Sequence, residues 1–214
     1  VGAGNFAIAS LVEAAEQCGV LCRTHDRKLS IGPTLLRWLA SVDSNQSRES
    51  LALGEMRELS ALTGETVGLA LLSSASRQLR MVQSVQGKGR IQYVLDAPSD
   101  IPLHLGAAGK AVLAFVPEWL DEIDRSPDSQ GRKAKPAELR KILEDIRTKG
   151  YATAEGERIP QAYGIAAPIF IDGQIAGSLT LTTPRYRIDR SRIPEVAEQV
   201  KKAASHLSRL FSIV

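Results

Sequence analysis

The sequence predicts an α+β protein in which an antiparallel sheet is flanked by helices. Apolar residues alternate with a period of two from Thr66 to Leu95 and again from Tyr163 to Thr183, which predicts strands. Before, between and after these segments the apolar residues recur at helical spacing, which predicts helices. Short turn-rich stretches separate the strand segments, so neighbouring strands are expected to pair in antiparallel fashion.

Length and composition are those of an ordinary globular chain. The 214 residues are 43% hydrophobic and 24% charged, which leaves room for one domain of good size with a smaller appendage. The net charge of +3 permits anionic partners but is too small by itself to indicate nucleic acid binding. There is no apolar run of membrane-spanning length and no leader, so we expect a cytoplasmic protein without a membrane partner.

The residues that could carry catalysis or hold a metal form no recognisable pattern. Cys18 and Cys22 are four apart, which fits neither a disulfide framework nor a CxxC pair, so a reducing compartment is expected. The motifs GxSxG and HExxH, the P-loop and the dinucleotide fingerprint do not occur. We therefore predict no catalytic residue, no cofactor and no metal site. The histidines lie far from any metal-ligand spacing: His25, His104 and His206.

The first 33 residues resemble the back half of a winged helix-turn-helix. A helix over 5–18, ended by Gly19, is followed by strands at 20–23 and 29–31 that a basic turn joins. The front half of the motif does not precede it, so we expect the true start of the protein to be missing. The formally neutral charge of the fragment argues against a DNA-facing role. The candidate DNA contacts are Asn5 and Ser10 on the helix and Arg23, Arg27 and Lys28 at the wing.

Residues 34–48 are predicted to link the two parts of the chain. A helix is expected from Thr34 to about Val42, followed by a polar connection over 43–48. Residues 49–214 are then the larger domain. It opens with a second helix, whose stripe serves either as core or as a dimer seam: Leu53, Met56, Leu59 and Leu62. Strands are expected from Thr66 onward, at Leu79–Val85 and at Ile91–Leu95.

The stretch Ile101–Pro117 combines a short strand, small residues from Gly106 to Gly109, and an apolar helix. Free amides at the start of such a helix attract carboxylates, so the stretch is a candidate anion cradle. The same small residues could instead serve only to let the helix pack closely on a sheet. Lys110 is interpreted as a helix residue near the rim of the cradle.

A hairpin is the clearest β signal in the chain. Strands at 163–171 and 174–183 are joined by Asp172-Gly173, which is typical of a type I′ turn. Pairing of Ile171 with Gln174 would place Ile165 opposite Thr180 and Ala167 opposite Ser178. Helices are expected at 118–125, 137–148 and 191–211. One hairpin face carries hydroxyls that either meet water or line a polar-floored pocket: Ser178, Thr180 and Thr182. Three charged residues before the hairpin could orient a ligand or simply be exposed: Glu155, Glu157 and Arg158.

Five ordered segments together resemble the IclR family of bacterial transcriptional regulators. They are LVEAAEQCGVLCRTHDRKLSIGP, ELSALTGETVGLALL, PLHLGAAGKAVLAFVP, RTKGYAT and YGIAAPIFIDGQIAGSLTLTTP. The resemblance implies a winged helix-turn-helix, a linker helix, and a GAF-like effector domain with a curved antiparallel sheet. It also implies a homodimer or tetramer that binds double-stranded operator DNA and controls catabolism of small organic acids or aromatic compounds.

The resemblance also implies an effector pocket. Its backbone amides fall on Ala107 and Ala108, and its hydroxyl residues on Thr180 and Thr182. A pocket Asp of some members falls on Ala154, and a pocket Cys falls on Gly164. Because the loss of those side chains makes room and removes polarity, we expect an acid larger or less polar than glyoxylate or pyruvate, such as an aromatic acid or a short semialdehyde.

Three functions are weighed. The first is an effector-responsive, DNA-binding transcriptional regulator, whose helix over 5–18 aligns with the recognition helix. The second is a stand-alone GAF-like small-molecule sensor or interaction module without DNA binding, which the neutral first helix favours. The third is a small-molecule enzyme that uses His104, Lys110 and Glu155, although no orienting triad can be assembled from the sequence.

Overall fold

The computed structural model describes residues 2–24, 26–36, 44–73, 76–122, 133 and 136–213. The chain divides into two compact units, residues 1–47 and 48–214, which are described separately. In the described part, no helix is both long enough and apolar enough to cross a membrane.

The N-terminal unit has the predicted helix and two-stranded wing. Helix α1 (Gly2–Gln17) is followed by antiparallel strands β1 (Leu21–Arg23) and β2 (Leu29–Ile31). Gly19 ends the helix with a φ of +70°, a conformation that a side chain would strain. Residues 33–36 begin a further helix, and the rest of the helix expected to Val42 lies outside the described residues.

Helix α3 (Ser44–Thr63) corrects the expected polar connection, because residues 44–48 belong to this helix. They contain no Gly or Pro that would stop it. The stripe is also rotated from the prediction, since Ala52, Met56 and Leu59 are buried and Leu62 is 68% exposed. Buried residues of α3 and α6 share one core cluster, so this stripe is core and not an exposed seam.

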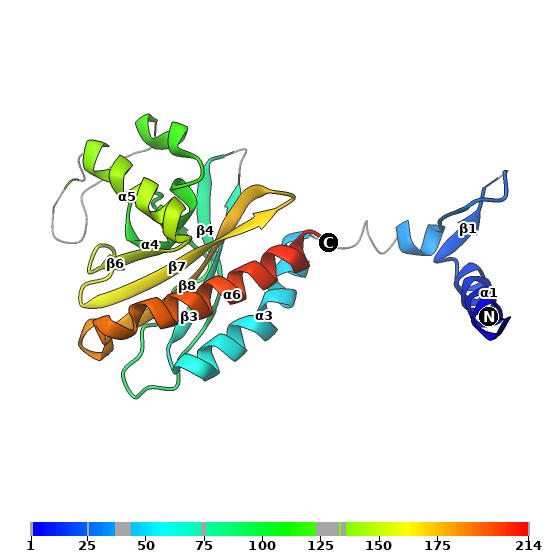
Figure 1. Ribbon diagram of the computed structural model, residues 1–214, viewed down its shortest axis with the longest axis horizontal. Coiled ribbons are helices and arrows are strands. Elements are labelled where there is room, and N and C mark those ends of the chain that lie inside the picture. Colours follow the sequence, from blue (N-terminus) through cyan, green and yellow to red (C-terminus); the bar gives the residue numbers. More distant parts are fainter. Residues whose placement is uncertain are drawn as a thin grey trace. The chain divides into compact units, whose positions relative to one another are not determined.

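The larger unit is built on a six-stranded antiparallel sheet with the order β5-β4-β3-β8-β7-β6. Figure 1 shows α4 and α5 over one face of the sheet, and α3 and α6 over the other. Two separate hydrophobic clusters fill these layers, one with α4 and α5 and one with α3 and α6. The strands are β3 (Thr66–Ser73), β4 (Gln78–Val85), β5 (Ser99–Ile101), β6 (Ala152–Glu155), β7 (Ala162–Ile171) and β8 (Gln174–Pro184). The helices are α4 (Gly106–Leu113), α5 (Pro136–Lys149) and α6 (Ile193–Phe211), with 3₁₀ turns η1 (Pro117–Asp121), η2 (Arg185–Arg187) and η3 (Arg190–Arg192).

Two further predicted elements differ from the structure. Residues 91–95 form no strand, because side chains bond their backbone instead: Thr66 donates to the carbonyl of Tyr93, and Ser84 donates to the carbonyl of Leu95. The helix expected at 118–125 is a 3₁₀ turn that begins at Pro117, and the residues after Glu122 lie outside the described part.

The β7–β8 hairpin has the predicted turn but a different register. Asp172 and Gly173 both have positive φ, at 50° and 78°, as a type I′ turn requires. Ile171 pairs with Gln174 as expected, but the register shifts between Ile169 and Phe170. Beyond this bulge every pairing moves by one residue, so Thr180 lies opposite Ala166, and Ser178 lies opposite Pro168.

Candidate functional site

A pocket lies between the start of α4, the end of β6 and strand β8. Its empty volume is about 460 Å³ when the space at its open mouth is included. The segment between β6 and β7 supplies Gly156, Glu157, Arg158 and Ile159 as one wall. Six of the seven residues predicted for effector binding line it: Ala107, Ala108, Ala154, Gly164, Thr180 and Thr182.

Helix α4 begins at the pocket because glycines let it lie close to its neighbours. Gly106 has a φ of +77°, which turns the chain into the helix. A side-chain carbon on Gly109 would lie 2.2 Å from the carbonyl oxygen of Pro102, so only glycine allows this approach. Gly164 serves the same end, because a side-chain carbon there would lie 3.3 Å from that of Ala107. The room expected at Gly164 is therefore largely taken by α4.

The first amide of α4 is already occupied by a carboxylate of the protein. Leu105 supplies no side-chain cap, and Glu157 accepts a hydrogen bond of 2.8 Å from the Gly106 amide. The other Glu157 oxygen pairs with Lys110 at 2.5 Å. The Lys110 side chain is 6% exposed, so this residue is buried and does not lie at the rim as interpreted from the sequence. The amides of Ala107 and Ala108, which lack intrahelical acceptors in the first turn, are the remaining candidates for binding an anion at this end of the helix.

The three alternating hydroxyl residues of β8, which are Ser178, Thr180 and Thr182, are all buried, so they do not face bulk water. Ser178 does not line the pocket: its hydroxyl donates to the Ala108 carbonyl at 3.2 Å and ties α4 to the sheet. Thr180 lines the pocket, is 5% exposed, and has a hydroxyl without a hydrogen-bond partner in the part of the chain that the structure describes. A buried polar atom left unsatisfied costs free energy, which makes the Thr180 hydroxyl a candidate for a hydrogen bond with a ligand.

Arg158 adds a cation to the pocket wall. Its Cδ lies 3.0 Å from where a side-chain carbon on Gly106 would be, so the stem packs over the start of α4. Burial lowers the pKa of the Arg158 guanidinium. The sequence leaves open whether Arg158 and Glu157 orient a ligand or are merely exposed, and the structure brings both to the pocket. Glu155 is not among the lining residues and pairs instead with Arg185 and Arg190.

The groups named for an enzyme are engaged separately. Lys110 forms an ion pair with Glu157, whereas Glu155 forms ion pairs with two arginines. Lys110 and Glu155 therefore have different ionic partners. Among the described residues, no group of three or more His, Cys, Asp and Glu side chains could hold a metal ion.

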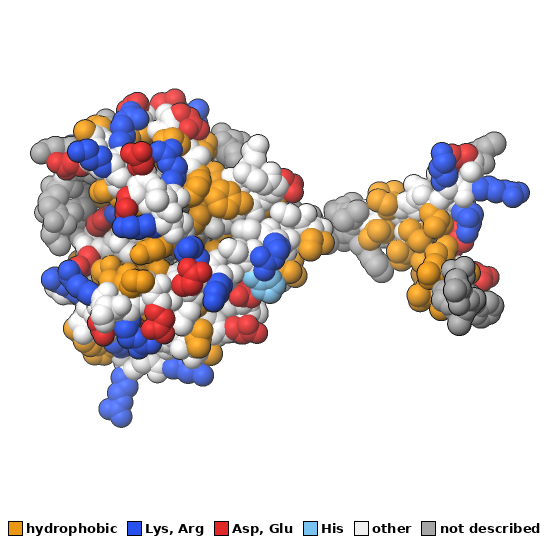
Figure 2. All heavy atoms as spheres, in the orientation of Figure 1, with side chains coloured by type: hydrophobic (Ala, Val, Ile, Leu, Met, Phe, Trp, Pro, Cys, Tyr) orange, Lys and Arg blue, Asp and Glu red, His pale blue; other side chains and the backbone are white. Residues whose placement is uncertain are grey.

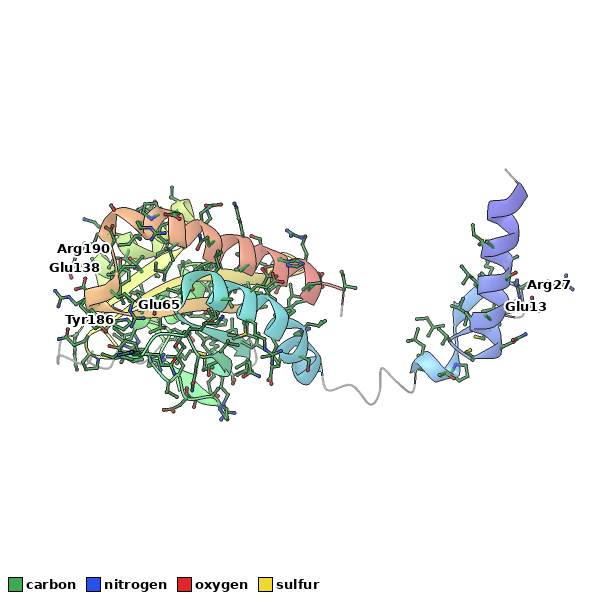
Figure 3. All side chains as sticks on the ribbon, turned by 90° about the horizontal axis from the view of Figure 1, so that it is seen from below. Glu13, Arg27, Glu65, Glu138, Tyr186 and Arg190 are labelled. Atoms are coloured by element: carbon green, nitrogen blue, oxygen red, sulfur yellow. The ribbon has the colours of Figure 1, made fainter. Side chains whose placement is uncertain are left out.

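The candidate DNA contacts are largely compensated within the N-terminal unit. Arg23 pairs with Glu16 at 2.8 Å, and Lys28 pairs with Asp26 at 2.8 Å. The Lys28 contact holds the pKa of the Asp26 carboxyl below its ordinary value. Arg27 extends outward at the turn of the wing (Figure 3) and Ser10 is exposed on α1, while the side chain of Asn5 lies outside the described part.

Comparison with known proteins identifies the family. Residues 42–209 match the family model of the bacterial transcriptional regulator IclR C-terminal domain. The chain is 28% identical over 184 residues to the HTH-type transcriptional regulator BhcR of Paracoccus denitrificans, covering 83% of this chain and 65% of that protein. It therefore spans just under two thirds of this relative.

Solved structures share the fold. The Thermotoga maritima IclR superposes with a TM-score of 0.71 at 23% identity, covering 94% of this chain and 83% of the other. An IclR homolog of Microbacterium hydrocarbonoxydans, complexed with 4-hydroxybenzoate, gives a TM-score of 0.68 at 21% identity, covering 96% and 85%. The expected GAF-like sheet flanked by helices is confirmed. The chain belongs to the IclR family of bacterial transcriptional regulators.

Proposed function

We propose that this chain is the effector-sensing part of a DNA-binding regulator that controls a catabolic operon. The unit 48–214 binds a small organic acid or aromatic metabolite in the pocket between α4 and β8. One observation carries this proposal: the buried Thr180 hydroxyl has no partner within the described residues and faces the same pocket as the free amides of α4. The Microbacterium relative with its bound 4-hydroxybenzoate supports an aromatic acid.

A thermal-shift screen with organic acids tests the ligand. A ligand at 100 times its Kd stabilises the native state by about 2.7 kcal/mol, which corresponds to roughly 5–10 °C in Tm for a unit of this size. We expect aromatic acids and short semialdehydes to give this shift. Tight binding of only two- or three-carbon oxoacids would contradict the expected ligand size.

A gel-shift assay tests DNA binding. The complete protein, with any residues that precede this chain, is expected to bind its own upstream DNA specifically and to change affinity when the screened acid is added. Within the N-terminal unit, Glu16 compensates the charge of Arg23, and Asp26 compensates that of Lys28. This favours the second candidate, a sensor without DNA recognition. Absence of a specific complex over a range of salt concentrations would decide for that candidate.

The same proposal includes the oligomeric state and the subcellular location of the protein. Operator sites read by such domains are commonly symmetric, so a homodimer or tetramer is expected in the cytoplasm, where the DNA is. Light scattering of the complete protein at micromolar concentration measures the mass, and a monomer would contradict the expectation.

A further inference from the structure

The ionisable groups of the pocket wall leave one positive charge uncompensated. Among the described lining residues, only Glu157 and Arg158 are ionisable. Both oxygens of Glu157 are used inside the protein, one by the Gly106 amide and one by Lys110. This carboxylate therefore balances the charge of Lys110, and within the described residues it makes no hydrogen bond or ion pair with Arg158.

Arg158 has no acceptor for its guanidinium in the part of the chain that the structure describes. Its stem lies over Gly106, which places the side chain beside the first turn of α4. The other polar groups aimed into the pocket are donors too: the Thr180 hydroxyl, which lacks a partner among described residues, and the amides of Ala107 and Ala108. These groups thus offer the pocket several donors and one cation, and none of them carries a negative charge that would compensate Arg158.

We infer that Arg158 is the residue that makes this pocket select a carboxylate over a neutral ligand. The guanidinium pairs with the effector carboxylate, while Glu157 stays with the Gly106 amide and Lys110, since its own negative charge repels a carboxylate ligand. A planar guanidinium binds a carboxylate through two parallel hydrogen bonds, which a single amide donor cannot match. This inference rests on the proposed function, because it concerns the same pocket.

The consequence is a specificity determined by charge as well as by shape. A carboxylate and its primary amide have nearly the same size, but the amide brings no negative charge to Arg158. Hydrogen bonds to charged groups are worth about twice those between neutral groups, so the acid is expected to bind about 10- to 100-fold more tightly than its amide.

Calorimetry on paired probes tests this directly. The probes are 4-hydroxybenzoate, benzoate and phenylacetate, each measured beside its primary amide, on the wild type and on Arg158→Gln. We expect the wild type to prefer the acids, and Arg158→Gln to bind acid and amide within about threefold, with amide affinity unchanged. Arg158→Lys keeps the charge without the fork, and is expected to retain part of the preference.

Arg209→Gln is the matched control, because Arg209 is exposed on α6, over the opposite face of the sheet, and its substitution removes the same charge. It is expected to behave as the wild type. Urea unfolding of each variant checks that the fold is intact. Unchanged acid preference in Arg158→Gln overturns the inference and leaves the proposed function standing. If none of the acids binds the wild type, both the inference and the aromatic-acid proposal fail.

Discussion

The three hydroxyls that alternate along β8 have different surroundings, although the sequence presents them as equivalent. Ser178 holds α4 through the Ala108 carbonyl, whereas Thr180 and Thr182 face the pocket. The difference follows from where α4 lies over the strand, and a single strand sequence contains no such information. Six pocket residues were predictable because five of them fall within the segments that resemble the family and the sixth, Ala154, directly follows one. The roles of Glu157 and Arg158 instead depend on how their loop folds back over Gly106.

This contrast predicts different effects of two conservative substitutions on the free energy of unfolding. Ser178→Ala removes a satisfied buried hydrogen bond and is expected to lower the free energy of unfolding by about 1 kcal/mol. Thr180→Val removes a buried hydroxyl that has no partner among described residues, so without ligand it is expected to be neutral or slightly stabilising. Urea unfolding measures both values.

Thr180→Val, which is expected to leave the stability nearly unchanged, should nevertheless affect ligand affinity. Thr180→Val is expected to weaken acid binding about 5- to 15-fold, because a hydrogen bond worth roughly 1–1.5 kcal/mol is lost. A Thr180→Val protein that is destabilised as much as Ser178→Ala would show that its hydroxyl is already satisfied.

At the scale of elements, helix α4 depends on close approach. All eight of its residues are buried, and it packs on β6, β7 and β8 while its start forms the pocket wall. Small residues therefore suit both interpretations left open by the sequence, close packing and ligand binding. The close packing is shown by the structure, and the ligand binding stays a prediction.

Two glycine substitutions in helices should have opposite signs. Gly109→Ala places a carbon 2.2 Å from the Pro102 carbonyl oxygen, so the backbone must move. We expect the free energy of unfolding to fall by about 2–3 kcal/mol. In α3, the carbon added by Gly54→Ala has no atom within 4 Å, so this substitution is expected to raise the free energy of unfolding by about 0.5–1 kcal/mol. Thermal or urea unfolding decides the matter, and equal effects would contradict the close approach of α4 to residues 102–103.

The hairpin shows what a sequence pattern can and cannot specify. The turn Asp172-Gly173 was predictable because two successive positive φ angles demand such residues. The bulge at Ile169 and Phe170 was not, because nothing in the alternation of apolar residues marks the extra residue. The expected strand at 91–95 failed for a related reason, since its partners are side-chain hydroxyls of other elements.

At the scale of the whole molecule, every residue that lines the pocket belongs to the unit 48–214. Figure 2 shows basic and acidic side chains interspersed over the visible face of this unit, so long-range attraction of an anion by that face is weak. Binding should therefore depend on the pocket itself and not on the N-terminal unit.

A fragment of residues 44–214, which keeps α3 whole, tests this expectation. It is expected to unfold cooperatively and to bind the screened acid with the same Kd as the complete chain, within about twofold. Calorimetry on both proteins compares the two values. A Kd tenfold higher for the fragment than for the complete chain would mean that the N-terminal unit contributes to ligand binding.

Strand β8 is the shared wall between two otherwise separate interiors. Its odd-numbered Leu179 and Leu181 belong to the core that contains α3, and its even-numbered Thr180 and Thr182 face the pocket. Since neighbouring side chains share one backbone, a ligand that displaces the backbone at Thr180 would also displace Leu179 and Leu181. The pocket and the core that contains α3 are therefore separated by the thickness of a single strand, so a coupling between them would not require a relay of side chains.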